Sequence, residues 1–531
     1  MKLRTAFIAS LIALSAAAAL LAAGGDDGKH WWSYLEALAN DQMEGRNTGS
    51  EAHRRAAQYV ATQFEQDGLK PAGVQGYIQP VKFDARKIVE PASSLALVHN
   101  GKAEQLVLGE DAVIGLRTDP ADAVEAPLVF AGYGLTVPEM HYDDLAGLDL
   151  RGRIIVTLSG SRPSNIPGPL NSHYSTPAER GRFLRDAGVI GTVTIANPHT
   201  ADIPWSRSSL ARFQEAMSLV DPALQDGGGL KIAVTANAAH ADKWLAGTGH
   251  TIDELLALAD AGKPLPRFPL NAGLRAKVKV ERRKLESQNI IAAWPGSDRV
   301  LKSEYVVFSA HVDHVGIGEP INGDRIYNGA MDNASGVASL LDIARTLRET
   351  NVKTRRSLLF VVVTGEEKGL LGSRYFAAHP TVDRKSMVAD LNIDMFLPIY
   401  PLRILTVHGL KESDLGDVAR RVAQSLSVEV QEDLQPERNV FIRSDQYNFI
   451  RRGIPALKMD VGFAKGSKEA AMQKDWLTNR YHAPSDDLNQ PVDLKAAADY
   501  NRILLKLAET VADDPARPQW KADSFFRRFA E

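Results

Sequence analysis

Cysteine is absent from the 531 residues of this chain, and neither charge dominates it, because 65 acidic and 62 basic side chains give a formal net charge of −3. Without cysteine no disulfide can form, so stability must come from the size of the hydrophobic core and from any bound metal. No basic patch with interleaved aromatic residues occurs, so a nucleic-acid partner is not expected. A GxSxG nucleophile elbow is also missing, which disfavours a serine hydrolase.

One long apolar stretch, Ala6 to Ala23, follows Lys2 and Arg4 and ends in small residues. This order predicts a secretory signal peptide over residues 1–23, and hence a secreted or periplasmic protein. An uncleaved anchor is the alternative, but the stretch is rich in alanine and only marginally long enough to span a bilayer. No cysteine follows it, which excludes a lipoprotein anchor, and we expect no stable membrane anchor.

Five residues with metal-binding side chains stand in short motifs: His311, Asp332, Glu367, Asp394 and His482. Histidine nitrogen and carboxylate oxygen suit borderline divalent metals such as zinc. Two metals that share one bridging carboxylate would use all five side chains. Glu366, directly before Glu367, would then be left over as a base.

These motifs fall at the ends of expected strands and in tight turns. His311 ends the apolar run that begins at residue 305, and Asp394 follows the strand-like sequence LNI. The paired glutamates close the apolar run 358–363. Asp332 lies in a glycine-bracketed turn before a run with helical periodicity, 337–347. Loops at strand ends are where an open α/β sheet carries its chemistry, so this pattern predicts an α/β fold.

Six motifs occur in a fixed order: HVD at 311–313, GAMDNASG at 329–336, GEE at 365–367, NID at 392–394, RSDQYNFIRRGIPAL at 443–457 and YHAPSDD at 481–487. Each is weak alone, but together they resemble the M28 zinc aminopeptidases, a family that also includes glutamate carboxypeptidase and transferrin-receptor relatives. MEGRNTGS at 43–50 also matches the opening of that family. The resemblance implies a mixed-sheet α/β zinc-exopeptidase domain flanked by helices.

The resemblance also implies a role for each candidate residue. The cofactor would be two Zn2+ ions, and five side chains would hold them: His311 and Asp394 on one ion, Glu367 and His482 on the other, and Asp332 between the two. Glu366 would be the general base, which takes a proton from the attacking water and returns it to the departing amine.

Three further positions match the family around this centre. Tyr481 matches a residue whose phenol donates to the developing oxyanion, with simple packing as the alternative. Asp313 and Asp486 match residues that support the site from behind, as acceptors for a ligand imidazole or for its loop.

Four details complete the expectations for the site. The peptide bond between Asp332 and Asn333 is expected to be cis. Met331 stands where relatives often carry aspartate, which leaves the bridging position unaffected. His314 lies in the same loop as His311, but we expect no direct role for it. Asp445 is expected either to touch substrate or to cap a helix, with the cap favoured.

We expect three parts in the chain: the signal peptide 1–23, a discontinuous M28-type catalytic domain of residues 24–84 and 273–531, and an insertion of residues 85–272. The insertion resembles the protease-associated (PA) domain, because PLVFAGYGL, RGRIIVTLSG and VIGTVTIAN are typical of short strands separated by glycine turns. Its segment 203–229 fits no obvious element. Helices are expected from Ser50 to Gly68 and over 494–511.

Together these observations predict a di-zinc metallo-aminopeptidase, a hydrolase whose partners are peptides with a free N-terminus. A carboxypeptidase or dipeptidase on the same site is one alternative, and a non-catalytic binding protein like the receptor branch is another. Every type of metal-binding residue is present, which disfavours a non-catalytic, receptor-like protein. A pocket that binds the C-terminal carboxylate of a substrate needs arginine, whereas a pocket that binds its N-terminal ammonium group needs only a nearby carboxylate. Side-chain preference, the native metals, the role of the insertion and the oligomeric state stay open.

Overall fold

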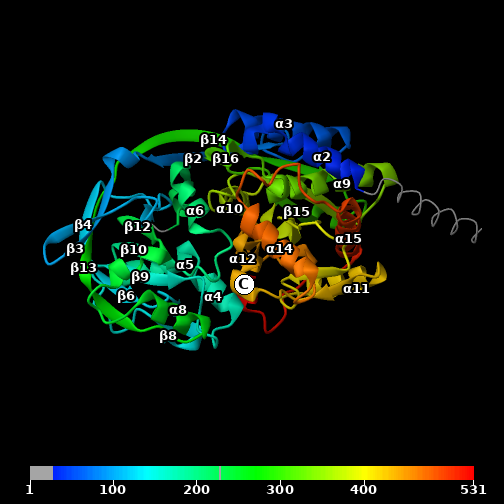
Figure 1. The fold of residues 1–531 in the computed structure, drawn as a ribbon. Coiled ribbons are helices and arrows are strands. Elements are labelled where there is room, and N and C mark those ends of the chain that lie inside the picture. The colour runs from blue at the N-terminus through cyan, green and yellow to red at the C-terminus, as the bar shows by residue number, and fades with distance from the viewer. Residues whose placement is uncertain (1–27, 227–228, 531) are drawn as a thin grey trace, which may run out of the picture.

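The computed structural model describes residues 28–226 and 229–530, so the signal peptide expected over 1–23 lies outside the described residues. Two sheets, one of ten strands and one of eight, form the two parts seen in Figure 1. A continuous antiparallel ribbon connects them: β2 (Ile78–Ile88) pairs with β14 (Val280–Trp294), and β3 (Ser94–His99) pairs with β13 (Arg267–Lys277). The β2–β14 pair is the long arch at the top of Figure 1.

The ten-stranded sheet has the order β11-β2-β14-β18-β15-β19-β22-β20-β21, with β1 (Lys70–Pro71) paired to β14. Its centre is parallel, and consists of β18 (Ser357–Val363), β15 (Tyr305–His311), β19 (Met387–Asn392) and β22 (Ala456–Gly462). Every residue of β18 and β19 is buried, as is typical of parallel strands covered on both faces. The edge strands are β11 (Ala216–Leu219) and β21 (Glu429–Gln431), and β20 (Ile404–His408) lies between β22 and β21.

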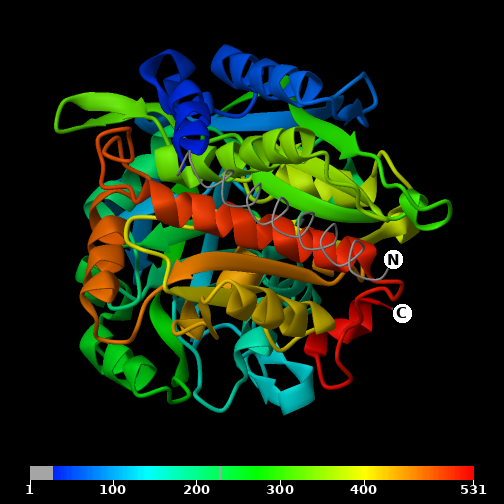
Figure 2. The same ribbon diagram turned by 90° about the vertical axis from the view of Figure 1, so that its right-hand side faces the viewer.

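Helices cover both faces of this sheet. One face packs against α2 (Lys29–Ala39), α3 (Glu51–Gln66), α9 (Ser335–Thr350), α11 (Asp414–Ser425) and α15 (Leu494–Asp513). The other packs against α10 (Leu371–Ala378) and α13 (Gln446–Ile450). Adjacent residues of β15 serve the two cores, since Phe308 lies in the first and Val307 in the second. Figure 2 shows α15 as the long red helix in front of the sheet.

The second sheet has the order β4-β3-β13-β6-β9-β10-β12-β5 and a core of its own. Its parallel strands are β6 (Ala123–Ala131), β9 (Ile154–Ser159), β10 (Gly191–Ala196) and β12 (Ile232–Ala236). The others are β4 (Lys102–Leu106) and β5 (Ala112–Ile114), and helices α5 (Pro177–Asp186) and α8 (Ile252–Asp260) accompany them. In segment 203–229, for which no element was expected, α6 (Trp205–Ser208) precedes β11, which pairs with β2 at the edge of the ten-stranded sheet.

The expected mixed-sheet α/β architecture with flanking helices is confirmed. The helices expected from Ser50 to Gly68 and over 494–511 are present as α3 and α15. The domain boundaries at residues 85 and 272, and the likeness of the insertion to a PA domain, stay predictions. Within residues 28–226 and 229–530, no helix has the length and apolar character needed to cross a membrane.

Candidate metal centre

The parallel centre of the sheet brings the predicted metal-binding residues together. His311 is the last residue of β15, Glu367 follows the end of β18, and Asp394 follows the end of β19. Because neighbouring parallel strands end at the same edge of the sheet, these side chains meet there. Asp332 lies in the turn Ala330–Ala334 before α9, and His482 lies between α14 (Lys468–Asn479) and α15. The peptide bond between Asp332 and Asn333 is cis, as expected.

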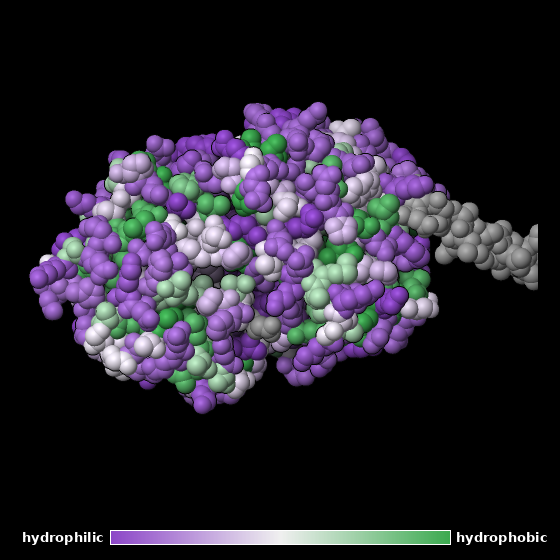
Figure 3. Space-filling model, in the orientation of Figure 1, coloured by the Kyte–Doolittle hydropathy of each residue, from purple (hydrophilic) through white to green (hydrophobic). Residues whose placement is uncertain are grey.

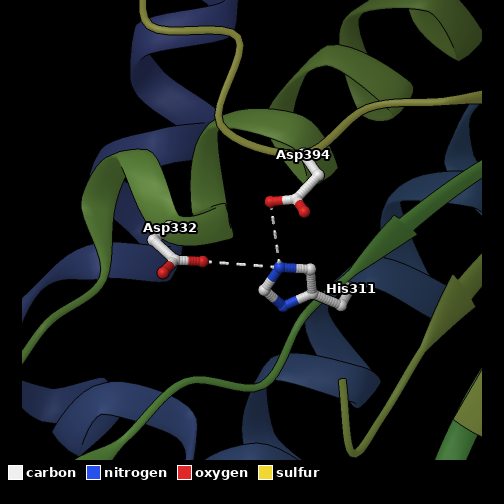
Figure 4. A group of neighbouring side chains, drawn as sticks. All are labelled: His311, Asp332 and Asp394. Atoms are coloured by element: carbon white, nitrogen blue, oxygen red, sulfur yellow. Dashed lines mark hydrogen bonds and ion pairs between the residues drawn. The ribbon is translucent and has the colours of Figure 1, made fainter. Parts of the chain in front are cut away.

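Two histidines approach Asp332 from opposite sides of its carboxylate. Nε2 of His311 lies 3.4 Å from Oδ1 of Asp332 and 3.3 Å from Oδ1 of Asp394, as Figure 4 shows. Nε2 of His482 lies 3.2 Å from Oδ2 of Asp332 and 3.2 Å from Oε2 of Glu367. Each oxygen of Asp332 therefore belongs to a different group of three side chains.

These separations match the spacing of ligand atoms around zinc. Donor atoms about 2.0–2.1 Å from a tetrahedral ion lie about 3.3 Å from one another. The nitrogen–oxygen distances in both groups are 3.2–3.4 Å. Nitrogen and carboxylate oxygen are also the donor types that zinc accepts. The residues therefore fit a pair of ions that share Asp332.

His314, for which no direct role was expected, lies against the same cluster. Its side chain is buried, and its Nδ1 is 2.7 Å from Oε1 of Glu367 and 3.7 Å from Oδ2 of Asp332. His314, Asp332 and Glu367 are close enough to hold an ion together. However, 2.7 Å is the length of a direct hydrogen bond, so His314 is better placed to orient Glu367. In the sequence, only its position three residues after His311 indicated that His314 could lie near the metal-binding residues.

Asp313 and Asp486 hold the backbone that carries the cluster. The carboxylate of Asp313 accepts hydrogen bonds from Oγ1 of Thr48, at 2.8 Å, and from the N–H of Glu366, at 3.1 Å. Nδ1 of His311 lies 3.0 Å from the backbone carbonyl oxygen of Asp313 and 4.0 Å from its carboxylate. The carboxylate of Asp486 accepts the N–H groups of Met331 and Asp332, at 2.9 and 3.0 Å. Both carboxylates thus accept hydrogen bonds from the loops, and that of Asp313 also lies within ion-pair distance of His311.

Arg46, which the sequence analysis did not single out, lies fully buried behind the cluster. Its guanidinium donates to four backbone carbonyls, those of Leu38, Val312, Asn328 and Gly329, at 2.5–2.8 Å. Three of these carbonyls, those of Val312, Asn328 and Gly329, belong to the segments that carry His311 and Asp332. Burial lowers the pKa of Arg46 to about 10, while nearby carboxylates act in the opposite direction, so the side chain stays charged at neutral pH. Arg46 therefore connects the loops that carry His311 and Asp332, called the metal loops below, to the N-terminal segment through hydrogen bonds.

The charges in the cluster strongly affect one another. Burial raises the pKa of Glu366 well above its ordinary value; His311 opposes this shift, and Asp394, Glu367 and Asp445 add to it. Burial also acts to raise the pKa of Glu367, but His482 and His314 outweigh it and hold that pKa well below the ordinary value. The cluster thus favours positive charge at its centre, which a divalent cation supplies.

Two cavities of about 510 Å³ each flank the cluster. The residues that line both are Arg117, Thr118, Glu367, Lys368 and His482. The first cavity is largely apolar, with Ile114, Leu116 and Leu210 in its wall. Glu366 and Tyr481 line the second. The face in Figure 3 is mostly hydrophilic and is hollowed near its centre, between the two parts of the chain.

Comparison with known proteins relates the segment that carries this site to a described family. Residues 289–508 match the model of the family described as Peptidase family M28, the family that the motifs resemble. Among curated proteins, the chain is 29% identical over 274 residues to the probable leucine aminopeptidase 2 of Aspergillus oryzae, which covers 48% of this chain and 51% of that protein. Aminopeptidase Y of Saccharomyces cerevisiae is 30% identical over 39% of this chain and 35% of its own length. These matches span about half or less of the relatives' own length.

Other relatives are similar over longer stretches. Carboxypeptidase Q of Xenopus laevis is 21% identical over 68% of this chain and 65% of that protein. The solved structure of an aminopeptidase from Aneurinibacillus sp. strain AM-1 aligns with a TM-score of 0.55 at 21% identity, over 92% of this chain and 95% of that one. A zinc aminopeptidase from Bacillus subtilis aligns with a TM-score of 0.50 at 18% identity, over 92% and 96%. These structures share the fold.

Replacement of Arg46 tests whether the metal loops depend on it. Arg46→Met should lower the free energy of unfolding by roughly 3 kcal/mol or more, because it leaves buried carbonyls without donors. It should also weaken zinc binding, since both loops lose a support. Thermal unfolding and zinc titration measure the two effects. Arg54→Met, at an exposed position of α3, is the matched control and should have little effect on either. Unchanged zinc affinity in Arg46→Met would contradict this account.

Proposed function

We propose that the protein is a di-zinc exopeptidase that releases N-terminal amino acids from peptides. The observation that carries this proposal is the carboxylate of Asp332, whose two oxygens face His311 and His482 at 3.4 and 3.2 Å. His311 and Asp394 would hold one ion, and Glu367 and His482 the other. When bound, the ions lower the pKa of water and polarise the substrate carbonyl.

Glu366 is the proposed general base. Its backbone N–H is fixed by Asp313 at 3.1 Å, and its side chain lines the second cavity beside the metal ligands. It is placed to accept a proton from the attacking water and to donate that proton to the departing amine. The adjacent Glu367 contacts both His314 and His482, so the two glutamates have different neighbours and, in this proposal, different roles.

Tyr481 is the proposed donor to the oxyanion. Its ring lies 4.1 Å from that of His482, centroid to centroid, and it lines the second cavity together with Glu366. A phenol in this position can donate to the carbonyl oxygen as negative charge develops there. Asp313, Asp486 and His314 would act indirectly, by positioning the groups that contact metal or substrate.

The direction of cleavage is supported by the relatives named as aminopeptidases and by the carboxylates around the site. A substrate ammonium group needs a carboxylate, and Glu366, Glu367 and Asp394 lie at the centre. A carboxypeptidase or dipeptidase is the second candidate, because arginine residues line the second cavity and one relative is named carboxypeptidase Q. A receptor-like protein without activity is less well supported, since all five candidate ligands converge.

We also propose that the mature protein is exported, on the basis of the charged and apolar pattern in residues 1–23. Expression of the full chain in a bacterium with a Sec pathway should give a periplasmic or secreted product whose N-terminal sequence begins close to residue 24. A product that retains Met1 in the cytoplasm would contradict export.

Glutamine substitutions separate the roles of the paired glutamates. Glu366→Gln should keep two zinc ions bound while kcat falls by about a hundredfold or more, because a proton acceptor is lost and no ligand is removed. Glu367→Gln should bind one ion less tightly. Elemental analysis and steady-state kinetics on the same samples measure both effects. Equal metal loss in the two variants would show that the roles are assigned wrongly.

The direction of cleavage is tested with blocked substrates. The zinc-loaded protein should hydrolyse a leucyl anilide and leave its N-acetyl derivative intact, because an aminopeptidase requires the free ammonium group. Release of the anilide is followed by absorbance. Release of a C-terminal residue from an N-blocked peptide, detected by mass spectrometry, would overturn the direction and leave the metal assignment in place.

A further inference from the structure

Two cationic side chains lie where the two large cavities meet. Arg117 and Lys368 line both cavities, as do the candidate metal ligands Glu367 and His482. Arg117 follows β5 of the second sheet, whereas Lys368 follows the paired glutamates of the catalytic segment. The two parts of the chain therefore each supply one positive charge to the same place beside the candidate metal centre.

Neither cation has an acidic partner among the described residues. No carboxylate oxygen of residues 28–226 or 229–530 lies within 4.0 Å of either charge, and the guanidinium of Arg117 makes one long hydrogen bond, 3.4 Å, to the backbone carbonyl of Glu367. The side chain of Lys368 is only 7% exposed, so its charge is largely removed from water. A nearly buried cation without an anion is unfavourable, and an anionic ligand offsets that cost.

The other arginines around the second cavity differ in this respect. Arg374 pairs with Asp226, Arg451 lies 3.6 Å from Glu179, and Arg443 lies 3.8 Å from Asp202. These six residues already form ion pairs within the protein. Arg117 and Lys368 are thus the cations of this cavity that remain available to a ligand.

The carboxylates near Lys368 have other partners. Glu215 lines the first cavity but forms a two-pronged ion pair with Arg283, at 2.7 and 2.6 Å. Asp313 accepts from Thr48 and from the N–H of Glu366. Glu367 contacts His314 and His482 and is a proposed metal ligand. None of these carboxylates forms an ion pair with Arg117 or Lys368, although their charges act on Lys368 from a distance.

We propose that Arg117 and Lys368 bind the α-carboxylate of the residue that follows the scissile bond, which makes short peptides, above all dipeptides, the preferred substrates. The inference rests on the proposed function. A dipeptide carries its carboxylate one residue beyond the scissile nitrogen, about 3.5 Å of chain, so the group that binds it must lie directly beside the metal centre. Arg117 and Lys368 occupy such a place, and an arginine fork suits the two oxygens of a carboxylate.

A binding experiment tests the subsite without requiring hydrolysis. Zinc-loaded Glu366→Gln protein is titrated calorimetrically with leucylglycine and with leucylglycinamide, which differ only in the carboxylate. Leucylglycine should bind about 10- to 100-fold more tightly, as is typical of charge-assisted hydrogen bonds. Equal affinity for the two ligands would overturn the carboxylate subsite, whatever the activity of the wild type proves to be.

Kinetics on the wild-type protein then locate the subsite. The readout is the ratio of kcat/KM for leucylglycine to that for leucylglycinamide. Arg117→Gln and Lys368→Gln should each lower this ratio about tenfold, mainly through KM, and Arg117→Lys should recover part of it. Arg275→Gln is the matched control, because Arg275 is exposed on the same part of the chain and pairs with Glu125. A ratio that stays at the wild-type value in both glutamine variants would overturn the assignment.

A third substrate shows whether the subsite binds an α-carboxylate or a side-chain carboxylate. Leucylaspartamide with a blocked α-carboxylate offers only a side-chain carboxylate. It should resemble leucylglycinamide in kcat/KM. Preference for it over leucylglycine would show that the subsite reads an acidic side chain, and would overturn the dipeptide proposal. Loss of hydrolysis of every substrate, including the leucyl anilide, would instead refute the proposed function, and the calorimetric comparison would still decide the subsite.

Discussion

The parallel alignment of β15, β18 and β19 is the constraint on which the site depends. His311 pairs in register with Val363 of β18, and Ser309 of β15 pairs with Asn392 of β19. Side chains alternate between the two faces of a strand, so a shift of one residue would turn His311 away from the carboxylates that follow the neighbouring strands. The buried residues of these strands, and the helices on both sides, hold this register. Packing far from the site thereby determines the distances between its charged groups.

A second constraint is the concentration of negative charge at that edge. Asp332, Glu366, Glu367 and Asp394 lie together in an environment from which water is largely excluded, where like charges repel strongly. Positive charge from the histidines and from Arg46 opposes this repulsion. A pair of divalent cations would complete the balance. The supporting residues are therefore as important to the centre as the side chains that would bind metal.

Local sequence was sufficient to predict much of this arrangement. The helix expected from Ser50 begins with the side chain of Ser50 as its cap and is followed by Gly68 at a positive φ of 79°, and the helix at 494–511 lies close to its expected bounds. Strand ends and glycine turns correctly indicated that the five candidate ligands would meet. Such features depend on a few consecutive residues, so they can be predicted from the sequence alone.

Features that depend on distant partners were missed. Arg46 lies in a short polar segment, and its four carbonyl partners come from three separate parts of the chain. β11 has only four residues and becomes a strand because the edge of β2 is available to it. The expectation that Asp445 caps a helix was wrong: it stands at the start of α13, but its side chain makes no capping bond and is buried. Burial of an acidic residue near the metal loops is decided by tertiary packing, which a helix-start pattern does not report.

The ribbon of β2, β14, β3 and β13 has a mechanical consequence. It is paired along both segments, and the N–H of Val89 continues the pairing by donating to the carbonyl of Lys279 where the segments join. On either side of this junction each strand pair is part of a wider sheet, so the ribbon has only two strands in the short stretch around Val89 and Lys279. Changes in its curvature would alter the angle between the two parts of the chain, and with it the width of the space above the metal centre. Under the proposed function, the curvature of this junction would then affect which substrates fit, through residues that lie away from the candidate metal ligands.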